Sequence, residues 1–160
     1  MKVQSLFLPG RKTTIFNMKK NIILLVEDDE LDIISVQRSL KKFDGEYELH
    51  TAYNGKEALT MLTENKLNLM PDVILLDLNM PKMNGIEFLK ILRADDSLKN
   101  IKVFIITTST ETADRNTTDQ LGISGYIIKP LNYNNNAKRG DSMEAFMQFY
   151  LRKIFAKEIE

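Results

Sequence analysis

The sequence contains no cysteine and only one histidine, His50, in 160 residues. Without cysteine the chain can form no disulfide, no thiolate nucleophile and no cysteine-ligated zinc site. A single histidine excludes metal sites built from several imidazoles and leaves little room for a Ser-His-Asp triad. His50 lies in a segment with the pattern of a strand, and we interpret it as a structural residue.

An excess of charge of either sign is also lacking, because 22 Lys and Arg balance 22 Asp and Glu. A net charge of zero argues against a broad electrostatic surface for nucleic acid. No stretch approaches the roughly 18 apolar residues of a membrane-spanning helix, and the N-terminus lacks the features of a signal peptide. We therefore expect a cytoplasmic protein that binds neither nucleic acid nor membranes.

The composition that remains is typical of one globular domain, with 43% hydrophobic and 28% charged residues. We interpret residues 1–19 as an N-terminal extension that is expected to be poorly ordered, and residues 20–157 as the domain. The residues after Pro130 suffice for one helix, so we expect no output domain.

Five segments have the apolar pattern of β-strands, and five helical patterns follow them in alternation. Unbroken apolar strands that alternate with helices indicate a parallel sheet covered on both faces. The sequence therefore predicts an α/β fold, a doubly wound (βα)5 unit with a five-stranded parallel sheet. The predicted strands are 22–26, 47–51, 72–78, 101–108 and 124–129.

Helical spacing also predicts which residues the helices bury. The last helix follows a polar loop at 132–140 and is predicted to begin at Asp141, which has the capping-box spacing to Glu144. Gly122 stands where the fourth helix is expected to stop. The predicted buried residues are Leu31, Ile34, Leu40 and Phe43 in the helix at 30–43; Ile86, Leu89, Ile91 and Leu92 in the helix at 86–94; and Met143, Phe146, Met147, Tyr150 and Ile154 in the last helix.

Polar residues collect at the carboxyl ends of the predicted strands, where ligands of open parallel sheets bind. Carboxylates there suit Mg²⁺, which also offsets their mutual repulsion, and a carboxylate can accept a phosphoryl group as aspartyl-phosphate. For the acids that follow the first strand, the alternative interpretation is a solvated loop that leads into a helix, because acidic residues are favourable at helix N-termini. The residues are Glu27, Asp28, Asp29 and Glu30 after the first strand, Asp77 at the end of the third, Thr107, Thr108 and Ser109 at the end of the fourth, and Lys129 at the end of the fifth.

Four segments, in order and each at the end of a predicted strand, resemble the receiver domain of bacterial two-component response regulators. The resemblance covers about residues 20–156 and implies the flavodoxin-like receiver fold. The sequence is also similar to small single-domain regulators that are paired with phytochrome-type kinases. The segments are VEDD (26–29), LLDLNMPKMNG (75–85), ITTS (106–109) and YIIKP (126–130).

The resemblance implies that Asp77 is the phospho-acceptor of a Mg²⁺-dependent reaction. The ion would be held by Asp28, Asp77 and the backbone carbonyl of Asn79, and Glu27 would act through water. Register with the family makes Glu27 and Asp28 the acidic pair, because a helix leucine follows the direct ligand by 12 positions, as Leu40 follows Asp28. Asp29 then becomes the N-cap of the first helix and Glu30 a solvent-facing acid of its first turn.

The resemblance also implies that Thr107 hydrogen-bonds the phosphoryl group and that Lys129 offsets its charge. Thr107 is preferred to Thr108 because it lies 22 positions before Lys129, which is the family spacing. Tyr126 would turn inward with Thr107 as a switch residue, although an aromatic at this position could equally be an ordinary core residue.

The function that the resemblance implies is that of a stand-alone receiver in a phosphorelay, a phosphoprotein rather than a conventional turnover enzyme. A sensor histidine kinase, with a phytochrome-type kinase as one candidate, or a histidine phosphotransfer protein would phosphorylate Asp77. The modification would switch a surface for a downstream protein, and the fourth helix, fifth strand and fifth helix would also offer a face for a homodimer.

Two other functions stay open at this point. A degenerate receiver would bind partners without phosphorylation, although the full set of Asp28, Asp77, Thr107 and Lys129 argues against lost chemistry. A Mg²⁺-dependent phosphohydrolase is disfavoured, because Asn79 stands where haloacid-dehalogenase-type enzymes place a second aspartate. Asn79 and Ser109 are expected to influence the rate of slow self-dephosphorylation.

Overall fold

Five parallel strands form the central sheet of the computed structural model, which describes residues 4–8, 11–15, 20–64, 70–108, 112–129 and 142–156. The strand order is β4-β3-β5-β6-β7, so the first strand of the sheet lies between the second and the third. This is the doubly wound order of flavodoxin-like proteins, which confirms the predicted fold class. The strands are β3 (Asn21–Val26), β4 (Tyr47–Ala52), β5 (Val73–Asp77), β6 (Lys102–Thr107) and β7 (Gly125–Ile128).

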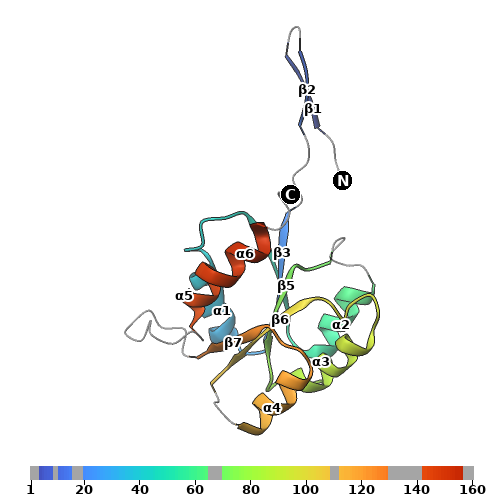
Figure 1. Cartoon of the computed structure of the whole chain (residues 1–160), viewed down its shortest axis with the longest axis vertical. Helices are drawn as coiled ribbons and strands as arrows, with labels where there is room; N and C mark the ends of the chain where they lie inside the picture. The colour runs from blue at the N-terminus through green and yellow to red at the C-terminus, as the bar shows by residue number, and fades with distance from the viewer. Residues whose placement is uncertain are drawn as a thin grey trace.

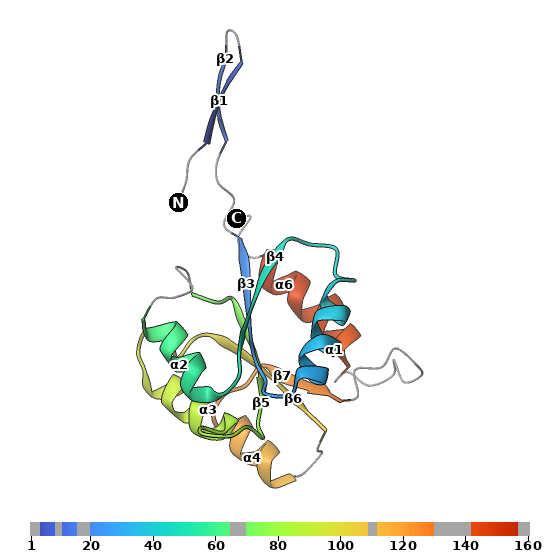
Figure 2. The same cartoon turned by 180° about the vertical axis from the view of Figure 1, so that it is seen from behind.

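Helices cover both faces of this sheet (Figure 1). One face carries α1 (Glu30–Leu40) together with a C-terminal helical segment, and the other carries three helices, as the view from behind also shows (Figure 2). The three are α2 (Gly55–Thr63), α3 (Gly85–Ala94) and α4 (Thr112–Gln120). The C-terminal segment comprises α5 (Met143–Ala145), the π-helical turn η1 (Phe146–Leu151) and α6 (Arg152–Ala156).

The unbroken apolar strands form the core because successive side chains point to opposite faces of the sheet. Leu25 and Leu75 pack on the side of α1 and the C-terminal segment, whereas Leu24 and Ile74 pack on the side of α2, α3 and α4. All four are fully buried. Burial of each such side chain stabilises the fold by about 1.5–3 kcal/mol, so the two core halves hold the strand ends in a fixed frame.

The predicted buried face of α1 is wrong for two residues, because Leu31 is 77% exposed and Ile34 is 42% exposed. The helix buries Ile33 and Val36 instead, together with Leu40, which is buried as predicted. These three lie on one stripe at about 100° per residue, and this stripe faces the sheet. The helix also ends at Leu40, so Phe43 packs against the core from the following turn.

The prediction for α3 is wrong at Ile91, which is 44% exposed, while Phe88 is fully buried. Leu89 and Leu92 are buried as predicted. Together with Phe88 they form the i, i+1, i+4 stripe of one helix face, and Ile91 lies beside that stripe.

The C-terminal segment begins at Ser142, whose hydroxyl accepts a hydrogen bond from the backbone N–H of Ala145 at 3.0 Å. Asp141, the predicted cap, and the loop 132–140 lie outside the described residues. The prediction that Tyr150 is buried is wrong, because Tyr150 is 42% exposed and Leu151 is fully buried. The π-helical turn adds a residue per turn and thereby moves the buried face by one position.

Two features lie outside the sheet. Residues of the N-terminal extension form an antiparallel pair, β1 (Gln4–Leu8) and β2 (Arg11–Ile15), although the sequence predicted no strands there. At the end of α4, Gly122 has φ +70°, which confirms the predicted helix stop.

Among the described residues, no helix has the length and apolarity needed to cross a membrane.

Candidate functional site

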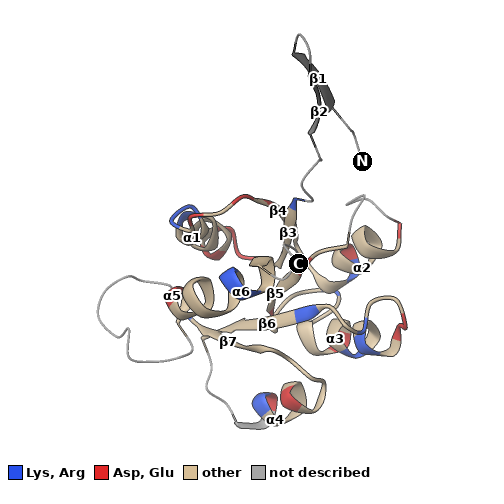
Figure 3. Cartoon of the chain, turned by 45° about the horizontal axis from the view of Figure 1, so that its top comes forward, with Lys and Arg blue, Asp and Glu red and all other residues tan. Residues whose placement is uncertain are grey.

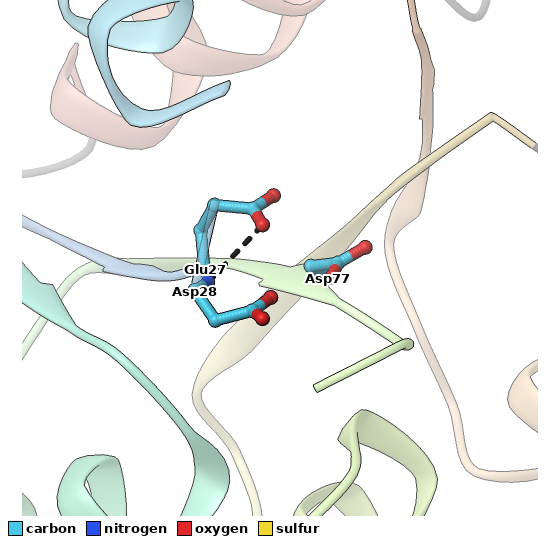
Figure 4. A group of neighbouring side chains, drawn as sticks. All are labelled: Glu27, Asp28 and Asp77. Carbon is cyan, nitrogen blue, oxygen red and sulfur yellow. Dashed lines mark hydrogen bonds between the residues drawn. The ribbon is translucent and has the colours of Figure 1, made fainter. Parts of the chain in front are cut away.

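Three carboxylates meet at the carboxyl ends of the neighbouring strands β3 and β5. Glu27 and Asp28 follow β3 directly, and Asp77 is the last residue of β5. One oxygen from each lies within 4.8 Å of the others, and Figure 4 shows the side chains grouped around this point. Glu27 is 1% exposed and Asp77 is 6% exposed, whereas Asp28 is open to solvent.

Glu27 is held in place by the protein itself. Its Oε1 accepts hydrogen bonds from the backbone N–H groups of Asp28 and Asp29, each at 3.1 Å. Its Oε2 accepts one from the Lys129 ammonium at 2.9 Å. Burial raises the pKa of Glu27, and these hydrogen bonds oppose that rise. Both oxygens of Glu27 therefore already have protein partners.

The other two acids of the first loop serve the helix. The Asp29 carboxylate accepts hydrogen bonds from the backbone N–H of Leu31 at 2.9 Å and of Asp32 at 3.1 Å. Asp29 is thus the N-cap of α1, as the register predicted, and Glu30 is an exposed acid of the first turn. Both positions favour negative charge, because the free N–H groups of a helix start carry partial positive charge.

The pKa of Asp77 is raised from its ordinary 3.8 to about 6. Burial is the largest cause, and repulsion from Glu27 and Asp28 adds to it. Lys129 and the backbone N–H of Asn79 act in the opposite direction without cancelling the rise. In the metal-free protein, ionisation of Asp77 therefore costs more free energy than ionisation of an ordinary aspartate.

The backbone around Asp77 is fixed by the start of α3. The Gly85 N–H donates to the Leu78 carbonyl at 3.0 Å. A Cβ at position 85 would lie 2.5 Å from the Asp77 carbonyl oxygen and 2.7 Å from the Leu78 Cα. Only glycine allows this close approach, so α3 and the end of β5 form one tightly packed unit.

Lys129 follows β7 and reaches back across the sheet toward the acids. Its Nζ lies 2.7 Å from Asp32 Oδ2, 2.9 Å from Glu27 Oε2 and 3.6 Å from Asp77 Oδ1. Burial alone would lower the pKa of Lys129, but the hydrogen bonds to Asp32 and Glu27 outweigh it and raise the pKa. The contact of Lys129 with Asp32 was not predicted from the sequence. The feature that could have indicated it is that Asp32 is an acidic residue in the first turn of the helix that begins at the site.

Thr107 is the last residue of β6 and is 6% exposed, whereas Thr108 is exposed. The backbone carbonyl of Thr107 accepts a hydrogen bond from the backbone N–H of Lys129 at 2.8 Å, which joins the ends of β6 and β7. His50 lies in β4 opposite Leu24, away from this edge of the sheet.

Tyr126 in β7 is turned toward α4. Its hydroxyl donates to Asp119 Oδ1 at 2.8 Å and lies 2.6 Å from Thr118 Oγ1 and 3.2 Å from the Arg115 carbonyl oxygen. The Arg115 guanidinium lies 4.1 Å from the ring centroid, within cation–π range. These contacts form a latch between β7 and α4.

The donor set fits a divalent cation that prefers oxygen ligands. Mg²⁺ is commonly bound by one or two carboxylates together with waters, and Asp28 offers an exposed carboxylate beside the buried Asp77. Such a site can bring a phosphoryl donor to the Asp77 carboxylate, with Lys129 as a second positive charge 3.6 Å from Asp77 Oδ1.

The comparisons with known proteins agree with this geometry. A family model described as response regulator receiver domain matches residues 23–139. Response regulator Rcp1 of Synechocystis is 34% identical over 128 residues, 78% of this chain and 87% of that protein. A solved Mn²⁺-bound form of Rcp1 aligns with TM-score 0.71 at 33% identity and covers 82% of this chain and 94% of its own.

Two further solved structures extend the likeness. A two-component response regulator from Legionella pneumophila has TM-score 0.65 and 44% identity over 81% of this chain and 98% of its own. The phosphorylated cyanobacterial phytochrome response regulator RcpA has TM-score 0.65 and 29% identity over 88% and 92%. The matched family and relatives of this identity and coverage establish that the chain belongs to the response regulator receiver family of two-component signal transduction.

Proposed function

We propose that Asp77 is the residue at which this receiver domain is phosphorylated, in a reaction that depends on Mg²⁺. The observation that carries the proposal is the position of the Asp77 carboxylate, which lies beside Glu27 and Asp28 and 3.6 Å from the ammonium of Lys129. The raised pKa of Asp77 in the metal-free protein supports it further, because a bound cation would relieve the cost of the buried charge.

Asp28, Asp77 and the backbone carbonyl of Asn79 would hold the ion. Bound there, Mg²⁺ supplies positive charge that offsets the phosphoryl oxygens and orients the donor. Glu27 would act through water, because both of its oxygens accept hydrogen bonds from protein groups.

In the reaction, a carboxylate oxygen of Asp77 attacks the phosphorus of a phosphohistidine or of a small acyl phosphate. The new bond is the P–O bond of an aspartyl phosphate, and the leaving group departs with the electron pair of the bond that breaks. Lys129 stays protonated and offsets the charge of the transferred group. The Thr107 hydroxyl would hydrogen-bond the new phosphoryl group.

The output of this reaction would be a change of surface. Phosphorylation adds about −1.5 to −2 charges, and Tyr126 would leave its latch with α4 and turn inward toward Thr107. The surface formed by α4, β7 and the C-terminal helices would change with it. Phe149 is 72% exposed on this segment and would contact a downstream protein or a second copy of the chain.

The partner that supplies the phosphoryl group would be a sensor histidine kinase or a histidine phosphotransfer protein in the cytoplasm. The similarity to RcpA, a phytochrome response regulator, supports a phytochrome-type kinase. Figure 3 shows both acidic and basic residues on α4. A helix of mixed charge fits a protein partner better than nucleic acid.

Incubation with acetyl phosphate and Mg²⁺, followed by intact mass spectrometry, tests the proposal. We expect one phosphoryl group on the wild-type protein and none on Asp77→Asn. An adduct that persists in Asp77→Asn would reject this acceptor. No adduct from either acetyl phosphate or a cognate kinase would favour a phosphorylation-independent adaptor, and rapid turnover of a phosphomonoester would favour a phosphohydrolase.

A further inference from the structure

Asp32 makes the shortest contact to Lys129, although the proposed chemistry assigns it no role. It is the third residue of α1, and its Oδ2 lies 2.7 Å from Lys129 Nζ. The same ammonium lies 3.6 Å from Asp77 Oδ1, beyond ordinary hydrogen-bond distance. The lysine of the site is therefore bonded to a residue of the helix rather than to the proposed acceptor.

The three carboxylates around Lys129 differ in the free-energy cost of losing their contact with its ammonium. The side chains of Glu27 and Asp77 are 1% and 8% exposed, whereas that of Asp32 is 35% exposed. A buried carboxylate that loses its partner is left without compensation. Asp32 can be hydrated when it is released, so it is the contact that Lys129 can break at the lowest cost.

We propose that Asp32 is a positioning residue that retains Lys129 in the unphosphorylated protein and competes with the phosphoryl group for it. The inference rests on the proposed function, since it takes Asp77 as the acceptor. When the phosphoryl group forms, Lys129 keeps its contact with Glu27, leaves Asp32 and turns to the new oxygens. The strength of the contact between Asp32 and Lys129 then limits how stable the phosphorylated state is.

Two matched variants separate this role from a general effect of charge. Asp32→Asn removes the charge with little change of shape and weakens the hold on Lys129. Glu30→Gln removes the same charge from the same helix turn, and the described contacts of Glu30 include none to Lys129. Asp32→Ser serves as a second variant if Asp32→Asn folds poorly.

The first measurement is the affinity for beryllofluoride, a phosphoryl analogue, at a fixed Mg²⁺ concentration. Because Lys129 no longer has to leave a charged partner, we expect Asp32→Asn to bind about threefold to tenfold more tightly than wild type, as for a partly exposed ion pair. Glu30→Gln should stay within about twofold of wild type. Equal or weaker binding by Asp32→Asn, or an equal gain in Glu30→Gln, would overturn the inference.

The second measurement is the crystal structure of unphosphorylated Asp32→Asn, which needs no phosphoryl chemistry. We expect Lys129 Nζ to move from 3.6 Å to hydrogen-bond distance of Asp77 Oδ1. A lysine that stays in place would refute the competition, even if the wild type binds beryllofluoride. A wild type that binds no beryllofluoride would instead count against the proposed function, while the lysine position still decides the role of Asp32.

Discussion

Replacement of Asp77 by asparagine should stabilise the metal-free protein at neutral pH, although it removes the central residue of the site. The folded-state pKa of Asp77 is about 6, against an ordinary value of 3.8. Because the folded pKa is raised, this group's contribution to stability is full below about pH 3.8 and is lost as the pH rises through 6. At about 1.4 kcal/mol per pKa unit, the loss is on the order of 2–3 kcal/mol.

Urea unfolding of both proteins in a chelating buffer, at pH 4 and at pH 7.5, measures this effect. We expect the stability of Asp77→Asn relative to wild type to increase by about 2–3 kcal/mol between the two pH values. Mg²⁺ should stabilise wild type more than the variant and reduce the difference.

The reasoning would be refuted if the difference between Asp77→Asn and wild type did not change with pH, or if the variant lost stability as the pH rose. The first result would mean that attraction to Lys129 at 3.6 Å cancels the effects of burial and of repulsion from Glu27 and Asp28, and the second that it outweighs them.

Three further predictions concern the frame of the site. Gly85→Ala forces a Cβ against the Asp77 carbonyl, so it should destabilise the fold by about 1–3 kcal/mol and slow phosphorylation by acetyl phosphate; unchanged values for both would contradict the tight packing. Thr118→Val removes one partner of the Tyr126 hydroxyl. NMR of the Tyr126 ring in the unphosphorylated variant should then show a larger population of the inward side-chain conformer. An unchanged spectrum would argue against the latch between β7 and α4. Arg93 donates to four backbone carbonyls around the ends of α3 and α4. We therefore expect Arg93→Met to lower the free energy of unfolding in urea by about 2–4 kcal/mol. A loss below about 0.5 kcal/mol would show that these hydrogen bonds do not hold the two helix ends together.

The fold could be predicted from the sequence because three of its strands, β3, β5 and β6, are nearly unbroken apolar runs. β5 is buried at every residue, and a short apolar run of this kind is typical of a strand covered on both faces. The helix faces were harder, since α1 carries adjacent apolar residues and periodicity alone could not decide between Ile33 and Ile34. In the C-terminal segment the π-helical turn moved burial from Tyr150 to Leu151, and no local sequence signal marks such a turn.

Helix caps can be predicted where one residue's side chain decides them. Asp29 caps α1 as expected, and Asn84 and Glu87 form a capping box at the start of α3 that was not predicted. The box predicted at Asp141 falls outside the described residues and stays a prediction. The Asn84-x-x-Glu87 spacing is visible in the sequence, yet the same residues also have the pattern of a turn, which hides the cap.

The residues of the site could be predicted because the carboxyl ends of parallel strands converge. The sequence placed Glu27, Asp28 and Asp77 at neighbouring strand ends, and the structure brings them together. Contacts between a strand end and a helix were not predictable in this way. The partner of Lys129 in α1, Asp32, depends on how the helix sits over the sheet, and so does the contact of Tyr126 with Thr118.

The most direct test of the central claim is to locate the phosphoryl group. The protein is phosphorylated with acetyl phosphate and Mg²⁺, the acyl phosphate is reduced with borohydride, and peptides are sequenced by tandem mass spectrometry. Reduction converts a phosphorylated aspartate to homoserine, and we predict homoserine at position 77 and at no other aspartate of the site. Homoserine at Asp28 instead, or an unreduced Asp77 in a protein that carries the phosphoryl mass, would contradict the assignment.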